Sequence, residues 1–451
     1  MKSACASLLL ILCLACTSKA PDGENEVGRI RQEMEEALGK GLLERWYPRA
    51  IDREYGGFLS AFTFDFKPTG EQDKMIVSQA RHVWNNAKAI KLYPDNPAYA
   101  ESAKHGFAFL RDVMWDSVYG GFHTLVSRSG TVKSNPREEK TAYGNSFGIY
   151  ACAAYAAASG DTSALSLAKK AFMWLEKYSH DPELKGYYQH MTRSGGVIRR
   201  DAGIQSTAET GYKDQNSSIH LLEAFTELYQ VWPDPLVAER LEEMLLLIRD
   251  KIVQPAGYMT LFFTPDWTPV SYRDSSVATI RRHLNLDHVS FGHDVETAYL
   301  LLEAAHVLGK HNDDTTREIA KSMVDHSLEN GWDSETGGFY DAGYYFPDSI
   351  GITIMHDTKN WWTQAEGLNT LLMMADLYPD DEQDYYGKFK TLWNYANDYL
   401  IDHENGEWYA GGLDKEPDQK SAMKGHIWKA GYHQVRSLMN CIERLERRTG
   451  R

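Results

Sequence analysis

Three short segments of the chain pair a histidine or tryptophan with an amide or carboxylate at helical spacing. The pairs are Asn216 with His220, His293 with Glu296, and Trp362 with Glu366. Residues three or four apart lie on one face of a helix. Three further segments, 79–84, 143–145 and 428–433, mix the same residue types. We expect all six segments to begin helices that face a common pocket.

These residue types favour proton transfer at a carbon next to a carbonyl group. That chemistry requires a base on each face of a planar enediolate. Imidazole, with an ordinary pKa of about 6.5, can take up and return protons at working pH. One base supplies about 10²–10⁴-fold, less than the ~10⁶-fold or more typical of enzymes, so charge stabilisation must add to it. Arg81, a permanent planar cation, suits the enediolate oxygen, with Tyr143 and Asn216 as neutral donors.

The residue types by themselves are also compatible with other reactions. Glu296 and Glu366 could serve as the two carboxylates of an inverting glycosidase. A metal site is disfavoured, because the chain has no His-Glu-x-x-His motif and no cysteine cluster. Taken singly, His220 is typical of a structural histidine, and Trp362 and Trp428 are typical of core. Their shared position in successive segments favours function.

A Gly-plus-aromatic turn recurs six times and sets the framework for these segments. Its first glycines stand at 56, 120, 186, 257, 337 and 406, in steps of 64, 66, 71, 80 and 69 residues. A second turn, such as Pro94-Asp95 or Gly160-Asp161, falls between them. The stretches between turns show apolar residues every three or four positions. We therefore predict six helix pairs closed into an (α/α)6 barrel with short β-hairpin loops; an open helical solenoid is the alternative.

Composition narrows the class of partner. The chain of 451 residues has a net charge of -15, which argues against nucleic acid. Twelve Trp and 26 Tyr suit a protein that stacks neutral sugars. No linker or low-complexity run interrupts the repeat, so residues 27–451 are predicted to form a single domain.

The first residues resemble an export signal. Lys2 precedes an apolar run at 8–12, and a small residue stands directly before Cys16. We expect 1–16 to be a signal peptide, Cys16 to be lipidated, and 17–26 to be a polar tether, which would anchor the protein in a bacterial cell envelope. Only Cys152 and Cys441 remain in the body, so no disulfide framework is expected.

The chain resembles the N-acylglucosamine 2-epimerase superfamily, and within it the cellobiose 2-epimerases. The most specific matches are Gly-His-Asp-Val-Glu at 292–296, Trp-Trp-Thr-Gln-Ala-Glu at 361–366 and Trp-Lys-Ala-Gly-Tyr-His at 428–433. The resemblance implies the same (α/α)6 barrel. It also implies opening of the reducing-end sugar of a β-1,4 disaccharide and inversion at C2 through a cis-enediol, without metal or other cofactor.

The resemblance also assigns roles to residues. His293 and His433 would transfer the protons, with Glu296 orienting His293. Arg81, Tyr143 and Asn216 would bind sugar oxygens. His220 and Glu366 would assist ring opening or hold hydroxyls. Trp362 would stack on the reacting sugar and Trp428 on the second one.

Several alternatives remain within this resemblance. Ala430 and Gly431 depart from the bulkier pair expected there, which leaves cellobiose and mannobiose undecided. An N-acylglucosamine 2-epimerase, an aldose-ketose isomerase acting on a monosaccharide such as mannose or glucose, a glycoside hydrolase using Glu296 and Glu366, and a non-enzymatic sugar-binding lipoprotein are the others. We expect a monomer that binds a neutral disaccharide or monosaccharide.

Overall fold

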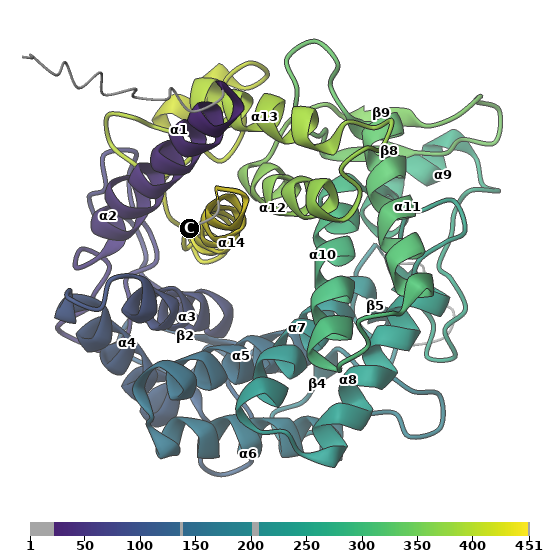
Figure 1. Cartoon of the computed structure of the whole chain (residues 1–451). Coiled ribbons are helices and arrows are strands. Elements are labelled where there is room, and N and C mark those ends of the chain that lie inside the picture. Colours follow the sequence, from purple (N-terminus) through teal and green to yellow (C-terminus); the bar gives the residue numbers. More distant parts are fainter. Residues whose placement is uncertain (1–21, 136–138, 201–206, 450–451) are drawn as a thin grey trace, which may run out of the picture.

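Two concentric rings of helices make up the molecule (Figure 1). A computed structural model describes residues 22–135, 139–200 and 207–449. The inner ring consists of α3 (Ile76–Leu92), α5 (Ala142–Ser159), α7 (Gln215–Val231), α10 (Phe291–Val307), α12 (Trp361–Leu377) and α14 (Tyr432–Arg448). The outer ring consists of α1 (Asp22–Glu36), α4 (Pro97–Phe109), α6 (Thr162–Tyr178), α8 (Pro235–Leu247), α11 (Asp314–Gly331) and α13 (Tyr385–Tyr395). The predicted (α/α)6 barrel is confirmed.

The ring is closed by its two ends. Each inner helix packs on the next, and α14 packs on α3 to complete the circle. Five helix pairs are consecutive in sequence, whereas the sixth joins α14 to the N-terminal helix α1. The open solenoid is therefore excluded, since no inner helix is left without two neighbours.

The turns from inner to outer helices are built from capping side chains. Asp161, for example, accepts a hydrogen bond from the Ser163 N–H at the start of α6. Asn96, Asp234, Asp313 and Asp384 cap the other four outer helices that follow an inner one. Such caps satisfy the N–H groups that a helix start leaves free.

The burial pattern follows from the two rings. The outer helix α6 is amphipathic and buries Leu167, Ala171 and Leu175 at spacings of four. Inner helices have neighbours on both sides and an outer helix behind, so most of their residues are buried. The core therefore lies between the rings.

Short strands and the Gly-aromatic turns lie where the inner helices begin. The strands are β1 (Lys74–Met75), β2 (Leu125–Val126), β3 (Lys140–Thr141), β4 (His190–Met191), β5 (Lys213–Asp214), β6 (Phe262–Phe263), β7 (Val289–Ser290), β8 (Ala342–Tyr344) and β9 (Thr353–His356). They pair antiparallel as β1-β2, β3-β4, β5-β6 and β7-β8-β9. Glycine is required at position 121 of the second turn: Gly121 has φ of +71°, and a Cβ there would lie 2.8 Å from the Trp174 ring.

Five of the six turns each contain a buried ion pair between a lysine and an aspartate. The pairs are Lys74 with Asp52, Lys140 with Asp116, Lys213 with Asp181, Lys359 with Asp333, and Lys424 with Asp402. In the first turn, Lys74 Nζ also donates to the Gly56 carbonyl at 2.6 Å. The fourth turn has Gln254 and Val289 instead, and this repeat carries the short extra helix α9 (Val277–Arg282).

The predicted N-terminal features lie largely outside the described residues. The signal peptide 1–16, Cys16 and positions 17–21 of the tether fall there and stay predictions. Helix α1 begins at Asp22, five residues before the predicted domain start at 27, so the end of the tether belongs to the barrel. Within the described ranges, no helix is long and apolar enough to span a membrane. Cys152 and Cys441 are free and buried.

Candidate active site

All six chemical segments lie at the starts of inner helices, at one end of the barrel. Arg81 is on α3, Tyr143 on α5, Asn216 and His220 on α7, His293 and Glu296 on α10, Trp362 and Glu366 on α12, and His433 on α14, with Trp428 just before it. Contacts join nine of these residues into two groups. Arg81, Trp428, Tyr143 and His220 form one group, and His293, Trp362, His433, Glu366 and Glu296 form the other. Asn216 instead lines a hollow of about 180 Å³ together with His293.

The two predicted proton-transfer histidines lie against one indole. The ring centroid of Trp362 is 4.8 Å from that of His293 and 5.8 Å from that of His433. The histidines come from α10 and α14, which are not neighbours in the inner ring. The fold thus brings two imidazoles from separate helices to the same aromatic platform.

His293 is held by a serine. Ser290 Oγ lies 2.8 Å from His293 Nδ1. The prediction that Glu296 orients His293 is wrong in this structure, because the Glu296 carboxylate faces α14 and binds Arg436. Burial, followed by the nearby His220, His288 and His433, lowers the pKa of His293 to about 3. Its neutral form is therefore favoured at working pH.

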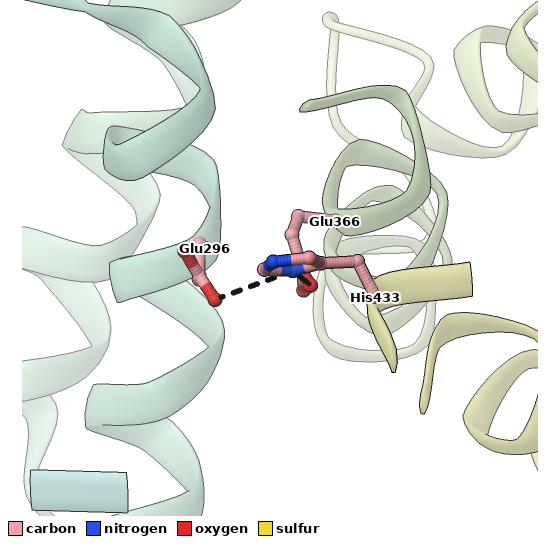
Figure 2. A group of neighbouring side chains, drawn as sticks. All are labelled: Glu296, Glu366 and His433. Atoms are coloured by element: carbon pink, nitrogen blue, oxygen red, sulfur yellow. Dashed lines mark hydrogen bonds and ion pairs between the residues drawn. The ribbon is translucent and has the colours of Figure 1, made fainter. Parts of the chain in front are cut away.

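His433 lies between two glutamates, of which Glu366 is within hydrogen-bond distance (Figure 2). Its Nδ1 lies 2.7 Å from Glu366 Oε1 and 3.9 Å from Glu296 Oε1. Glu366 was expected to assist ring opening or hold hydroxyls, but its oxygen already engages this imidazole. Burial, aided by the charges of Arg81 and Arg436, holds the pKa of His433 well below its usual range despite the opposing charge of Glu296.

A buried arginine, Arg436, binds three carboxylates from three helices. One terminal nitrogen lies 2.6 Å from both Glu296 Oε1 and Glu366 Oε1, and the other contacts Glu223 Oε1. His433, Glu296 and Glu366 offer ligand atoms within 4.8 Å of one another, a spacing that a metal ion could use. The guanidinium already binds both of these carboxylates.

His220 belongs to the same network. Its Nδ1 lies 2.8 Å from Glu223 Oε2, and the Tyr432 hydroxyl also contacts Glu223. Burial alone would raise the pKa of this carboxyl, but the charge of Arg436 and the hydrogen bonds from His220 and Tyr432 lower the pKa of Glu223 to about 2. Glu223 is therefore ionised and accepts from the imidazole.

Arg81 reaches the mouth of the site. Its guanidinium donates to the Trp428 carbonyl at 3.0 Å and to the Tyr143 hydroxyl at 3.3 Å. It also lies over the rings of Phe147 and Tyr432, at 4.6 and 5.1 Å from their centroids. Trp428 is half exposed, at 50%, so its ring is not part of the core and is free to meet a ligand.

Sequence reasoning missed three residues of this site. Glu223 stands three residues after His220, and Arg436 three after His433, so the spacing that identified the other pairs would have found both. Ser290 is the last residue before α10, and no pattern marks it.

Comparisons with known proteins identify the family of this chain. The sequence matches the N-acylglucosamine 2-epimerase (GlcNAc 2-epimerase) family over residues 56–437. It is 28% identical to cellobiose 2-epimerase of Bacteroides fragilis over 92% of this chain and 98% of that protein. It is 25% identical to D-mannose isomerase of Marinomonas mediterranea over 89% and 94%, respectively.

A solved structure shows the same architecture at full length. Cellobiose 2-epimerase from Spirochaeta thermophila superposes with a TM-score of 0.77 at 29% identity, covering 94% of this chain and 98% of that one. Together these matches confirm the predicted class of enzyme, a carbohydrate epimerase or isomerase. The chain belongs to the N-acylglucosamine 2-epimerase family.

Proposed function

We propose that this enzyme inverts C2 of the reducing-end sugar of a neutral β-1,4 disaccharide of the cellobiose type. The observation that carries the proposal is the placement of His293 and His433 against Trp362, each with Nδ1 engaged by a protein group. That arrangement leaves each Nε2 as the ring nitrogen available to a sugar carbon. The similarity to cellobiose 2-epimerases supports the choice of substrate.

The chemistry would run on one proton shared between the two imidazoles. After the sugar ring opens, the neutral imidazole removes the C2 proton and the C2–H electrons form the enediolate. The other imidazole is neutral in the free protein, but the negative charge that develops on the enediolate beside it favours uptake of a proton from water. In that form it returns a proton to the opposite face of C2. The sugar is restored as its epimer, and the protonation states of the two histidines are exchanged.

Three other residues would support these steps. Arg81 carries a permanent positive charge, and its Nε–H has no protein partner among the described residues, so it suits the developing enediolate oxygen. His220, held by Glu223, suits proton transfer during ring opening. Trp428 suits stacking of the second sugar.

An aldose-ketose isomerase is the second candidate. The 25% identity to a D-mannose isomerase favours it, and protonation of the same enediolate at C1 rather than C2 would give the ketose. The inverting hydrolase has no support from the geometry. The Glu296 and Glu366 oxygens lie within 4.8 Å of each other, whereas such enzymes need about 6.5–9.5 Å.

Product analysis tests the proposal. The protein is incubated separately with cellobiose, mannobiose, N-acetylglucosamine and mannose, and the products are identified by NMR. A C2 epimer formed most efficiently from one of the two disaccharides supports the proposal. A ketose as the main product favours the isomerase, and release of a monosaccharide from cellobiose favours a hydrolase. Unchanged sugars in all four incubations would refute it.

A further inference from the structure

Arg436 is the one cation that contacts all three buried carboxylates of the site within the described part of the chain. The arginine is 2% exposed, and its glutamate partners Glu223, Glu296 and Glu366 are 3%, 1% and 0% exposed. A buried carboxylate without a counter-charge takes up a proton rather than remain ionised. The ionised state of this cluster therefore depends on a single side chain.

Two of these carboxylates hold imidazoles. Nδ1 of His433 lies 2.7 Å from Glu366 Oε1, and Nδ1 of His220 lies 2.8 Å from Glu223 Oε2. Only an ionised carboxylate is obliged to accept, so each keeps the hydrogen on Nδ1 and leaves Nε2 as the basic nitrogen. A protonated glutamic acid could donate to Nδ1 instead and would move the imidazole hydrogen to Nε2.

We propose that Arg436 is a positioning residue that sets the tautomers of His433 and His220 together, by holding Glu366 and Glu223 as carboxylates. The inference rests on the proposed function. Arg436 itself touches no sugar in this scheme. It acts on both the C2 proton transfer and ring opening through the two glutamates.

The surrounding groups determine the direction of the pH effect. The titratable and charged groups facing the cluster are Arg81 on α3, Tyr143 and Tyr150 on α5, His220 and Glu223 on α7, His293, Glu296, Tyr299 and Glu303 on α10, Glu366 on α12, and Tyr432 and His433 on α14. Burial raises the pKa of Glu366 above its ordinary value, and the charge and hydrogen bond of Arg436 oppose that rise. Arg436 also helps to lower the pKa of His433, after burial and the charge of Arg81. Removing its charge raises both, so the acid limb of the kcat profile moves to higher pH.

A second cavity gives access to Arg436 from behind. This cavity, of about 370 Å³, is lined by Arg436 together with Trp84, Lys88, Glu303 and Asn440. These residues lie farther along the inner helices than the sugar site. Small guanidinium ions can therefore reach the position of a truncated Arg436 without crossing the sugar site.

Kinetics of four variants test the proposal. We expect Arg436→Met to lower kcat for cellobiose epimerisation about 10²-fold, to change KM less than about threefold, and to move the acid limb up by about one pH unit. Arg436→Lys retains the charge, so its acid limb should stay in place while kcat falls. Arg436→Ala should regain activity at least about tenfold when guanidinium chloride is added at non-denaturing concentration.

Arg240→Ala is the matched control. Arg240 also binds three glutamates, at 2.9 Å from Glu176, 2.7 Å from Glu239 and 3.2 Å from Glu243, but it lies on the outer helix α8. It should lose stability with no change in the pH profile. An unchanged profile in Arg436→Met, or no rescue of Arg436→Ala, would overturn the proposal. If neither variant folds, a shifted acid limb in Arg436→Lys overturns it as well.

Histidine NMR separates this inference from the function on which it rests. In protein labelled with ¹⁵N-histidine, His433 and His220, assigned with His→Gln variants, should both carry the hydrogen on Nδ1. Arg436→Lys should keep that tautomer, whereas Arg436→Met should lose it. This result does not depend on which sugar is turned over. A wild-type protein with Nε2–H tautomers contradicts the inference, and one that epimerises no sugar contradicts the proposed function.

Discussion

His82 provides a quantitative test of burial in the first inner helix, directly beside Arg81. Its ring is 1% exposed, stacks on Phe58 at a centroid distance of 4.7 Å, and its Nδ1 lies 2.9 Å from the Tyr47 hydroxyl. Burial lowers the pKa of His82 to about 3. The folded protein therefore keeps this ring neutral at a pH where an unfolded chain protonates it.

The size of the effect follows from the difference in proton uptake. The unfolded pKa is about 6.5, so stability from the neutral ring is fully present above that value and is lost as pH falls towards 3. Between pH 8 and pH 5, a group with these two pKa values costs about 2 kcal/mol of unfolding free energy. His82→Phe keeps an aromatic ring but binds no proton. Between pH 8 and pH 5 we therefore expect its free energy of unfolding to fall by about 2 kcal/mol less than that of the wild type.

Urea unfolding at pH 8, 7, 6 and 5 measures the difference. The curves of unfolding free energy against pH for wild type and His82→Phe should run parallel above pH 7 and separate below 6.5. Phe58→Leu is the control, since it removes packing from the same ring without removing the titrating group, and its curve should parallel wild type throughout. Parallel curves for wild type and His82→Phe down to pH 5 would refute the assignment of a buried neutral imidazole.

Three further predictions concern the site. Trp428→Ala should weaken disaccharide binding by about 1–3 kcal/mol and leave monosaccharide binding unchanged; equal effects on both sugars in a titration would show that Trp428 contacts the reacting ring. Ser290→Ala should lower kcat about tenfold with little change in KM, because His293 loses its Nδ1 partner; an unaltered kcat would mean that Ser290 is dispensable. Glu366→Gln should lower kcat about 10²-fold at unchanged thermal stability, measured by calorimetry. Wild-type turnover by this variant would exclude a role for the carboxylate in orienting His433.

The helical framework was predictable because its signals are local. Each Gly-aromatic turn and each capping aspartate marks a boundary within a few residues of sequence, and α6 shows its buried face as a simple period. The way in which the ring closes was harder to predict from the sequence, because the pairing of α1 with α14 joins the two ends of the chain. The lysine-aspartate pairs escaped notice because their members are about 22 to 32 residues apart, as in Lys74 with Asp52 and Lys213 with Asp181.

The sequence predicted which residues form the site better than it predicted which of them contact one another. Spacing along one helix placed His293 and Glu296 on the same face, but the carboxylate turns to Arg436 and His433 on α14. Contacts between helices depend on how the barrel closes, and spacing within one helix carries no information about them. The same reason explains why Glu366 could be named as a site residue without its partner His433.

Hydrogen exchange at the sugar carbon tests the central claim most directly. Wild-type protein is incubated with cellobiose in heavy water, and both the remaining substrate and the product are analysed by NMR. The two-histidine scheme predicts deuterium at C2 of the epimer, and no such label when His293→Ala or His433→Ala, each shown to be folded, replaces the wild type. Epimer formed without deuterium at C2, or label introduced at the wild-type rate by either variant, would contradict it.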